Sequence, residues 1–126
     1  MLAAVRSQRS RASRRTNPLR VSESFKGFAL AQLEELGDVM PRAMFGGVGL
    51  YHRGLFFGII ANDVLYLKVD DMNRADYERA GMQPFKPYPH RPATMRYYPV
   101  PVDVLESAFE LAKWARKAVK AASISR

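Results

Sequence analysis

Apolar residues recur at helical spacing in a segment near the start of the chain. They occupy positions i, i+3, i+4, i+8 and i+11 and form one stripe, interrupted by Gln32, that consists of Phe25, Phe28, Ala29, Leu33 and Leu36. Ser22 precedes the stripe as an N-cap, and Gly37 follows it where glycine commonly ends a helix. The pattern predicts a helix between these two residues.

A second helical stripe lies near the end of the chain. Its apolar members are Leu105, Ala108, Phe109, Ala112, Ala115 and Val119, and Trp114 widens the same face. Asp103 and Glu106 have the spacing of a capping box at the start of this helix. We expect a long C-terminal helix that buries the stripe. A shorter helix is predicted between a cap at Asp71 or Asn73 and a stop at Gly81.

Between the helices, the pattern changes to short apolar segments separated by turn residues. The strongest strand candidates are Val48–His52, Leu55–Ala61 and Val64–Val69. Arg53-Gly54 and Asn62-Asp63 are two-residue turns that join antiparallel neighbours. Residues 43–45 are a further candidate strand, and residues 95–98, in a proline-rich segment, a candidate edge strand. The predicted fold is therefore α+β: an antiparallel β-meander flanked by an N-terminal helix, a short middle helix and a long C-terminal helix.

The first turn fixes the expected register of the sheet. The resulting pairs are Leu50 with Phe57, Tyr51 with Phe56, and Gly49 with Gly58. One face then carries Tyr51, Phe56, Ile60, Leu65, Leu67 and Val69. The other carries Leu50, Phe57, Ile59, Val64 and Tyr66. Because both faces are apolar, either helices cover both sides or one face meets another subunit.

The net charge of +8 is unevenly distributed along the chain. The first 20 residues hold six arginines and no acid, whereas the remainder holds 14 basic and 12 acidic side chains. We expect residues 1–20 to be a disordered basic tail and residues 21–126 to be a single domain. Three interpretations of the tail are open: a plain extension, a transit peptide in a eukaryotic host, or a twin-arginine start that lacks the apolar segment export needs.

The glycine-rich stretch Met44–Gly54, "MFGGVGLYHRG", does not match a phosphate-binding loop. Gly47-Val48-Gly49 is followed by a predicted strand rather than by a third glycine and a helix N-terminus. We therefore expect these glycines to serve a turn and a flat spot in the sheet.

No other set of side chains predicts catalysis. The chain has no cysteine and two histidines, His52 and His90, too few for a structural zinc site. The aspartates near residue 70 do not match a calcium loop and suit a helix N-terminus instead. No serine lies in a nucleophile elbow. We expect no catalytic residue, no metal and no cofactor, hence no enzyme, in a cytoplasmic protein without a membrane segment.

Two sets of basic residues are candidates for nucleic-acid contact. The tail contributes Arg6, Arg9, Arg11, Arg14 and Arg15. The proline-rich loop contributes Lys86, Arg91 and Arg96, which alternate with the rings of Phe85, Tyr88, His90, Tyr97 and Tyr98. Packing of these rings onto the core and a small-molecule pocket are the alternatives for the loop.

Several motifs together resemble the N-terminal domain of the TfoX/Sxy family. They are "RAMFGGVGLY", "GLFFGIIANDVLYLKVDDMNRADYERAG" and "MRYYPVPVDVLE", within a likeness that runs from about Ser22 to Val119. The resemblance implies an antiparallel sheet flanked by helices and a link to regulation of natural competence in bacteria. Two-domain members act as transcriptional co-regulators, and we expect this chain to be a stand-alone N-terminal domain without the second domain.

The sequence and the resemblance together predict a non-enzymatic regulatory domain that acts through protein–protein contacts. The expected interface coincides with the family motif and consists of Met44, Phe45, Gly46, Gly47, Gly49, Tyr51, Phe56 and Gly58. We expect a protein partner or a homodimer. The alternative is a nucleic-acid-associated protein that binds DNA or RNA electrostatically through the tail and the aromatic, basic loop.

Overall fold

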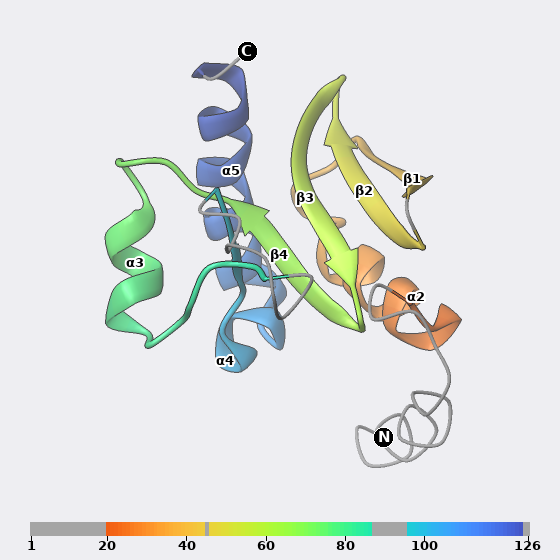
Figure 1. Cartoon of the computed structure of the whole chain (residues 1–126). Coiled ribbons are helices and arrows are strands. Elements are labelled where there is room, and N and C mark those ends of the chain that lie inside the picture. Colours follow the sequence, from red (N-terminus) through yellow and green to blue (C-terminus); the bar gives the residue numbers. More distant parts are fainter. Residues whose placement is uncertain (1–19, 45, 87–95, 125–126) are drawn as a thin grey trace.

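The computed structural model describes residues 20–44, 46–86 and 96–124. In chain order, the elements are α2 (Glu23–Gln32), β1 (Val39–Met44), β2 (Gly47–His52), β3 (Leu55–Ala61), β4 (Val64–Lys68), α3 (Arg74–Arg79), β5 (Tyr97–Pro99), α4 (Val102–Leu105) and α5 (Ala108–Ile124). The strands form one antiparallel sheet in the order β1-β2-β3-β4-β5 (Figure 1). The predicted α+β class and the flanking helices are confirmed.

One face of the sheet carries the main core. Helix α5 runs along this face against β3 and β4, and α2 contacts α5 (Figure 1). The core combines apolar residues of the strands with Ala29 of α2, Leu33 directly after it, Tyr77 of α3 and Leu111 of α5. We call this side of the sheet the helix face.

The N-terminal helix begins where the sequence predicts and ends one turn earlier. The Oγ of Ser22 accepts a hydrogen bond from the amide of Phe25 at 3.2 Å, as an N-cap does. The helix ends at Gln32, and the chain then passes through turns to Gly37, whose φ is +79°. Gln32, the polar residue within the apolar stripe, has a structural role: its Nε2 donates a hydrogen bond to the carbonyl of Leu105 at 2.8 Å.

The C-terminal helical segment is divided in two, and the predicted capping box is wrong. The short α4 follows Pro101, whereas α5 begins after Ser107, whose Oγ accepts from the amide of Glu110 at 3.2 Å. The buried face of α5 keeps Ala112 and Ala115 of the expected stripe and extends to Leu111, Ala118, Ala121 and Ala122. Phe109, expected in the core, is 61% exposed, and the Lys113 Nζ lies 4.9 Å from its ring centroid.

The middle helix α3 starts after Asn73, one of the two predicted cap residues. Asn73 occupies the N-cap position, but its side chain makes no capping bond. Its Oδ1 accepts from the amide of Asp70 at 2.8 Å, and its Nδ2 donates to the carbonyl of Lys68 at 3.1 Å. Asn73 therefore fixes the connection from β4 to α3.

A bulge in β3 changes the predicted register. Tyr51 pairs with Phe56 as expected, but Leu50 pairs with Gly58 and leaves Phe57 without a partner on β2. The extra residue moves Phe57 to the helix face and leaves Phe56 on the opposite one. The predicted pairing of Gly49 with Gly58 is wrong, because Gly49 pairs with Ile59. Beyond the bulge, Ile59–Tyr66 and Ile60–Leu65 pair as predicted.

Both predicted hairpin turns are confirmed by their backbone angles. The φ values are +50° and +86° at Arg53 and Gly54, and +52° and +57° at Asn62 and Asp63. Positive φ at both central residues is the signature of the turn whose twist matches that of the strands it joins. These short loops place β2, β3 and β4 side by side.

Candidate functional site: the aromatic face and the β1 groove

The sheet face opposite the helices is dominated by aromatic rings with cations beside them. Its buried residues are Ala61, Phe85 and Tyr97, with Phe56, Ile59 and Tyr66 packed against them. The ring centroids of Tyr66 and Phe85 are 4.2 Å apart, and those of Phe56 and Tyr97 are 5.8 Å apart. We call this side of the sheet the aromatic face. It is built partly by residues that were expected on the two different faces.

The family motif contributes the outer part of the aromatic face. The rings of Tyr51 and Phe56 stack with centroids 5.0 Å apart. A Cβ added to Gly49 would lie 2.6 Å from the Met44 Sδ and 3.1 Å from the Phe56 Cε1. Gly49 therefore does not provide the expected flat spot on the surface of the sheet, because the side chains of Met44 and Phe56 cover it.

The remaining motif residues are divided. Gly58 lies on the helix face, where an added Cβ would approach the side chains of Leu50 and Leu67. Gly46 is exposed, with a φ of +82°, and Gly47 starts β2. Phe45 lies outside the described residues. The predicted interface set is thus partly surface and partly core.

At the β1 edge, the aromatic face continues into an open groove of about 770 Å³, which we call the β1 groove. It is lined by Asp38, Val39, Met40, Arg42, Tyr51, Arg53 and Gly54. Met40 pairs with Tyr51 across the strands and is 62% exposed. The Arg42 guanidinium carbon lies 5.7 Å from the Tyr51 ring centroid, and the Arg53 Nε lies 2.9 Å from the Asp38 Oδ2. Two guanidinium groups, a ring and a methionine thus share one concave surface.

Of the groove residues, sequence reasoning selected Tyr51 alone. The alternation of Met40 and Arg42 around Pro41 was the available signal, but β1 was expected to begin only after Pro41. A proline is tolerated here because β1 is an edge strand. An edge strand has a neighbour on one side, so a missing amide hydrogen costs at most one hydrogen bond of the sheet.

His52 has a structural role at the end of β2. Its Nδ1 donates to the carbonyl of Gly37 at 2.8 Å, which ties the strand to the turn that precedes β1. His90 lies outside the described residues. Within the described ranges, no group of three or more His, Cys, Asp or Glu side chains is arranged to hold a metal ion.

Burial shifts the titration of several side chains on the aromatic face. It raises the pKa of the Tyr66 and Tyr97 phenols. Partial burial, together with the charge of Arg96, lowers the pKa of Lys68, whose Nζ lies 5.7 Å from the Tyr97 ring centroid. These groups pack against one another rather than converge on a common point.

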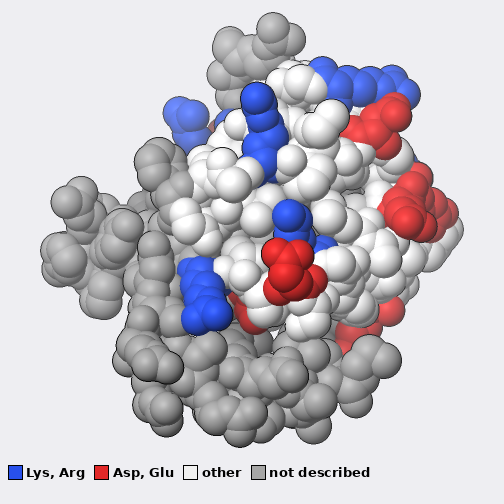
Figure 2. All heavy atoms as spheres, turned by 90° about the vertical axis from the view of Figure 1, so that its right-hand side faces the viewer, with Lys and Arg blue, Asp and Glu red and all other residues white. Residues whose placement is uncertain are grey.

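Of the predicted nucleic-acid residues, the structure describes Lys86 and Arg96, which lie next to Phe85 and Tyr97 on two segments joined by a hydrogen bond from the Phe85 amide to the Tyr97 carbonyl at 2.7 Å. Both basic residues are exposed, while Arg91 and the tail arginines Arg6, Arg9, Arg11, Arg14 and Arg15 lie outside the described residues. Phe85, Tyr97 and Tyr98 are buried, so these loop rings pack onto the core. Figure 2, viewed from the β1 side, shows positive and negative side chains mixed on the described surface rather than one positive field.

The described elements form a small α+β domain in which the helices pack on one face of the sheet. A sequence model of the TfoX N-terminal domain matches residues 31–122, and the chain belongs to this family. Among curated proteins, no sequence matches the chain. No helix in the described ranges is long and apolar enough to cross a membrane.

Proposed function

We propose that this chain is a non-enzymatic, cytoplasmic regulatory domain, related to competence regulators, that binds a protein partner through the β1 groove. The observation that carries the proposal is the composition of that concave surface: Met40, Arg42, Tyr51 and Arg53. Tyrosine, arginine and methionine are enriched in the centres of protein interfaces, where a few such side chains supply most of the binding energy. Membership of the family is consistent with the regulatory role.

The groove offers a partner side-chain contacts rather than the backbone hydrogen bonds of an added strand. Pro41 lies in the middle of the edge strand β1 and offers no amide hydrogen to an added strand. Tyr51 is held by its stack on Phe56 and by Arg42 above it, so little side-chain freedom is lost when a partner packs there. The partner is a different protein or a second copy of this chain.

The proposal is tested with Met40→Asp and Arg42→Glu, separately and together. The control is Val102→Asp, which changes another exposed large apolar residue outside the groove. Partners are cross-linked to the full chain in its source organism and identified, and binding is remeasured with the purified pair. Light scattering measures self-association in parallel.

We expect each groove variant to weaken binding by about tenfold or more, the loss that follows when an interface hot spot is removed. The double variant should also lower the frequency of DNA transformation if the host is naturally competent. A strictly monomeric protein with no partner, or binding that is equally strong in the double variant, would refute the proposal.

A further inference from the structure

A second concave surface lies on the opposite side of the fold, between the connection from β4 to α3 and the last turns of α5. This hollow has a volume of about 170 Å³, and its lining includes Met72, Lys117, Lys120, Ala121 and Ile124. We call it the α5 hollow. It is far smaller than the roughly 300–1,000 Å³ of pockets for drug-sized ligands, and its size suits a single side chain of a partner.

Two of the most exposed large apolar side chains in the described structure border this hollow. Met72 is 80% exposed and Ile124 is 63% exposed. They come from segments far apart in the sequence, and Ala121 also lines the hollow. Large apolar side chains gathered around a depression mark a site where another molecule covers them.

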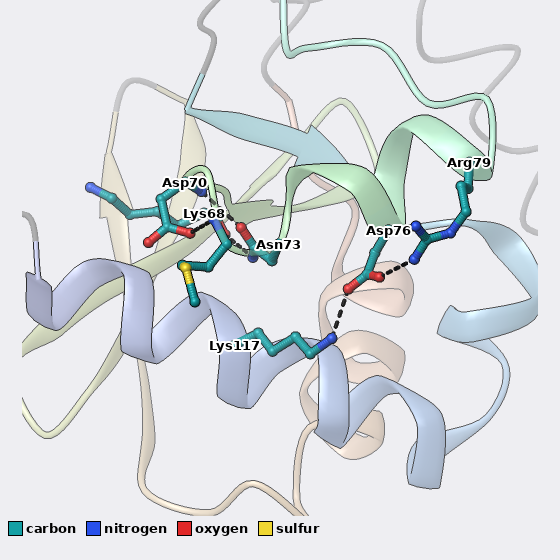
Figure 3. Close-up of polar contacts among 7 residues, drawn as sticks. Lys68, Asp70, Asn73, Asp76, Arg79 and Lys117 are labelled. Atoms are coloured by element: carbon teal, nitrogen blue, oxygen red, sulfur yellow. Dashed lines mark hydrogen bonds and ion pairs between the residues drawn. The ribbon is translucent and has the colours of Figure 1, made fainter.

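The connection that presents Met72 is fixed by hydrogen bonds (Figure 3). The Asp70 Oδ1 accepts from the amide of Met72 at 2.9 Å, and the buried Asn73 holds the amide of Asp70 and the carbonyl of Lys68. This wall is therefore in place before any partner binds, which lowers the entropic cost of binding.

The other wall of the hollow is basic. Lys117 reaches across to α3, where its Nζ lies 2.8 Å from the Asp76 Oδ2, while Arg79 takes the second oxygen of the same carboxylate (Figure 3). Lys120, one turn further along α5, is exposed and makes no ion pair within the described ranges. Asp70 also lines the hollow, and its Oδ1 accepts a hydrogen bond from the amide of Met72.

We propose that the α5 hollow is a docking site for an acidic peptide segment of a partner protein. A bulky apolar side chain of the segment enters between Met72 and Ile124, and a neighbouring carboxylate pairs with Lys120. The inference rests on the proposed role as an interaction domain, but it assigns a different surface. A nucleic acid does not fit, because the lining is predominantly apolar. An anionic membrane is the competing ligand, and the experiment must distinguish membrane binding from binding of an acidic peptide.

The experiment selects peptides of about a dozen random residues from a displayed library on the full chain, then measures one enriched peptide by fluorescence anisotropy. We expect enriched sequences to place Asp or Glu beside Leu, Ile, Met or Phe. Met72→Glu, Ile124→Glu and Lys120→Glu should each weaken binding by about tenfold. Higher salt should weaken binding to the unchanged protein as well, because the carboxylate contacts are exposed and screened.

Val102→Glu is the matched control, since it changes an exposed apolar residue of α4 that lines neither the α5 hollow nor the β1 groove and should leave peptide affinity unchanged within about twofold. Failure to enrich any peptide, peptides without acids, or binding that survives both Met72→Glu and Ile124→Glu would overturn the inference. Binding of the chain to vesicles of anionic lipid that is lost in the same variants would also overturn it. Loss of a partner in Met40→Asp concerns the β1 groove alone, so the two proposals fail separately.

Discussion

The two faces of the sheet come from the same strands but have different roles. On the helix face, Leu50, Phe57, Ile60 and Leu67 are fully buried. On the aromatic face, Tyr51, Phe56 and Tyr66 are half-buried. The first face is occupied by the protein's own helices, whereas the second keeps ring surface beside Arg42 and Lys68. Among the described residues, the helices therefore pack on one face of the sheet although both faces carry apolar side chains.

The test with the largest expected effect compares Phe57 with Phe56, which are adjacent in the sequence and lie on opposite faces of the sheet. Phe57→Ala should cost about 3–5 kcal/mol of unfolding free energy, because it removes a ring that is fully buried in the main core. Phe56→Ala should cost clearly less, because Phe56 is half-buried and can be partly replaced by water. Urea unfolding of both variants measures the difference. Equal losses would mean that the two faces contribute alike to folding.

Two glycines provide a second test, at a smaller scale. A Cβ at Gly58 would lie 3.0 Å from the backbone oxygen of Tyr66, which cannot move freely, so Gly58→Ala should cost about 1–3 kcal/mol. At Gly49 the nearest atom is the end of the flexible Met44 side chain, and Gly49→Ala should cost less. Thermal unfolding of the two variants compares them. A larger loss for Gly49→Ala would show that the aromatic face is packed more rigidly than the helix face.

Tyr77 on the helix side gives the third and smallest test. Its ring packs edge-on against Trp114, and among the described side chains its buried hydroxyl has no hydrogen-bond partner. Tyr77→Phe should therefore leave stability unchanged or raise it by about 1 kcal/mol at neutral pH, because an unpaired buried polar group is removed. Chemical denaturation at pH 7 measures this, and a loss above about 1 kcal/mol would reveal a partner for the hydroxyl.

Alkaline pH sharpens the same test. Burial, with a smaller contribution from Asp76, raises the pKa of Tyr77 above its ordinary value of 10.0. The folded state therefore keeps its proton where the unfolded state loses it, so stability is fully present below pH 10 and falls as the pH rises further. Tyr77→Phe should flatten this decline, and more so than Tyr66→Phe, whose phenol is less buried. If the stability of Tyr77→Phe falls with pH as steeply as that of the unchanged protein, the raised pKa of Tyr77 does not cause the decline.

Most of the fold could be predicted because its signals are local. Ser22 was identified as an N-cap by its position before an apolar stripe, and Arg53-Gly54 and Asn62-Asp63 were identified as hairpin turns by residue type. The end of the N-terminal helix and the start of α5 were missed. Ser107 and Glu110 have the same spacing as Asp103 and Glu106, so spacing alone does not distinguish the cap from its neighbour.

The candidate site was predicted less completely than the fold. Tyr51 was selected through the family motif, whereas Met40, Arg42 and Arg53 were not. Their proximity depends on β1 running through Pro41 and pairing with β2, and proline argued against a strand there. The α5 hollow was missed for a similar reason, since Met72 and Ile124 are distant in the sequence and meet only after α5 packs onto the sheet.

The sequence by itself determined the α+β class, the meander and its turns, because helix stripes, strand segments and turn pairs depend on neighbouring residues. It also carried the motifs by which the family was recognised. Only the tertiary structure decided which ring faces the helices. One unpaired residue, Phe57, reverses the side-chain alternation at the start of β3. Whether a strand accommodates such a bulge depends on the packing of both faces, and a pattern of alternating residues does not contain that information.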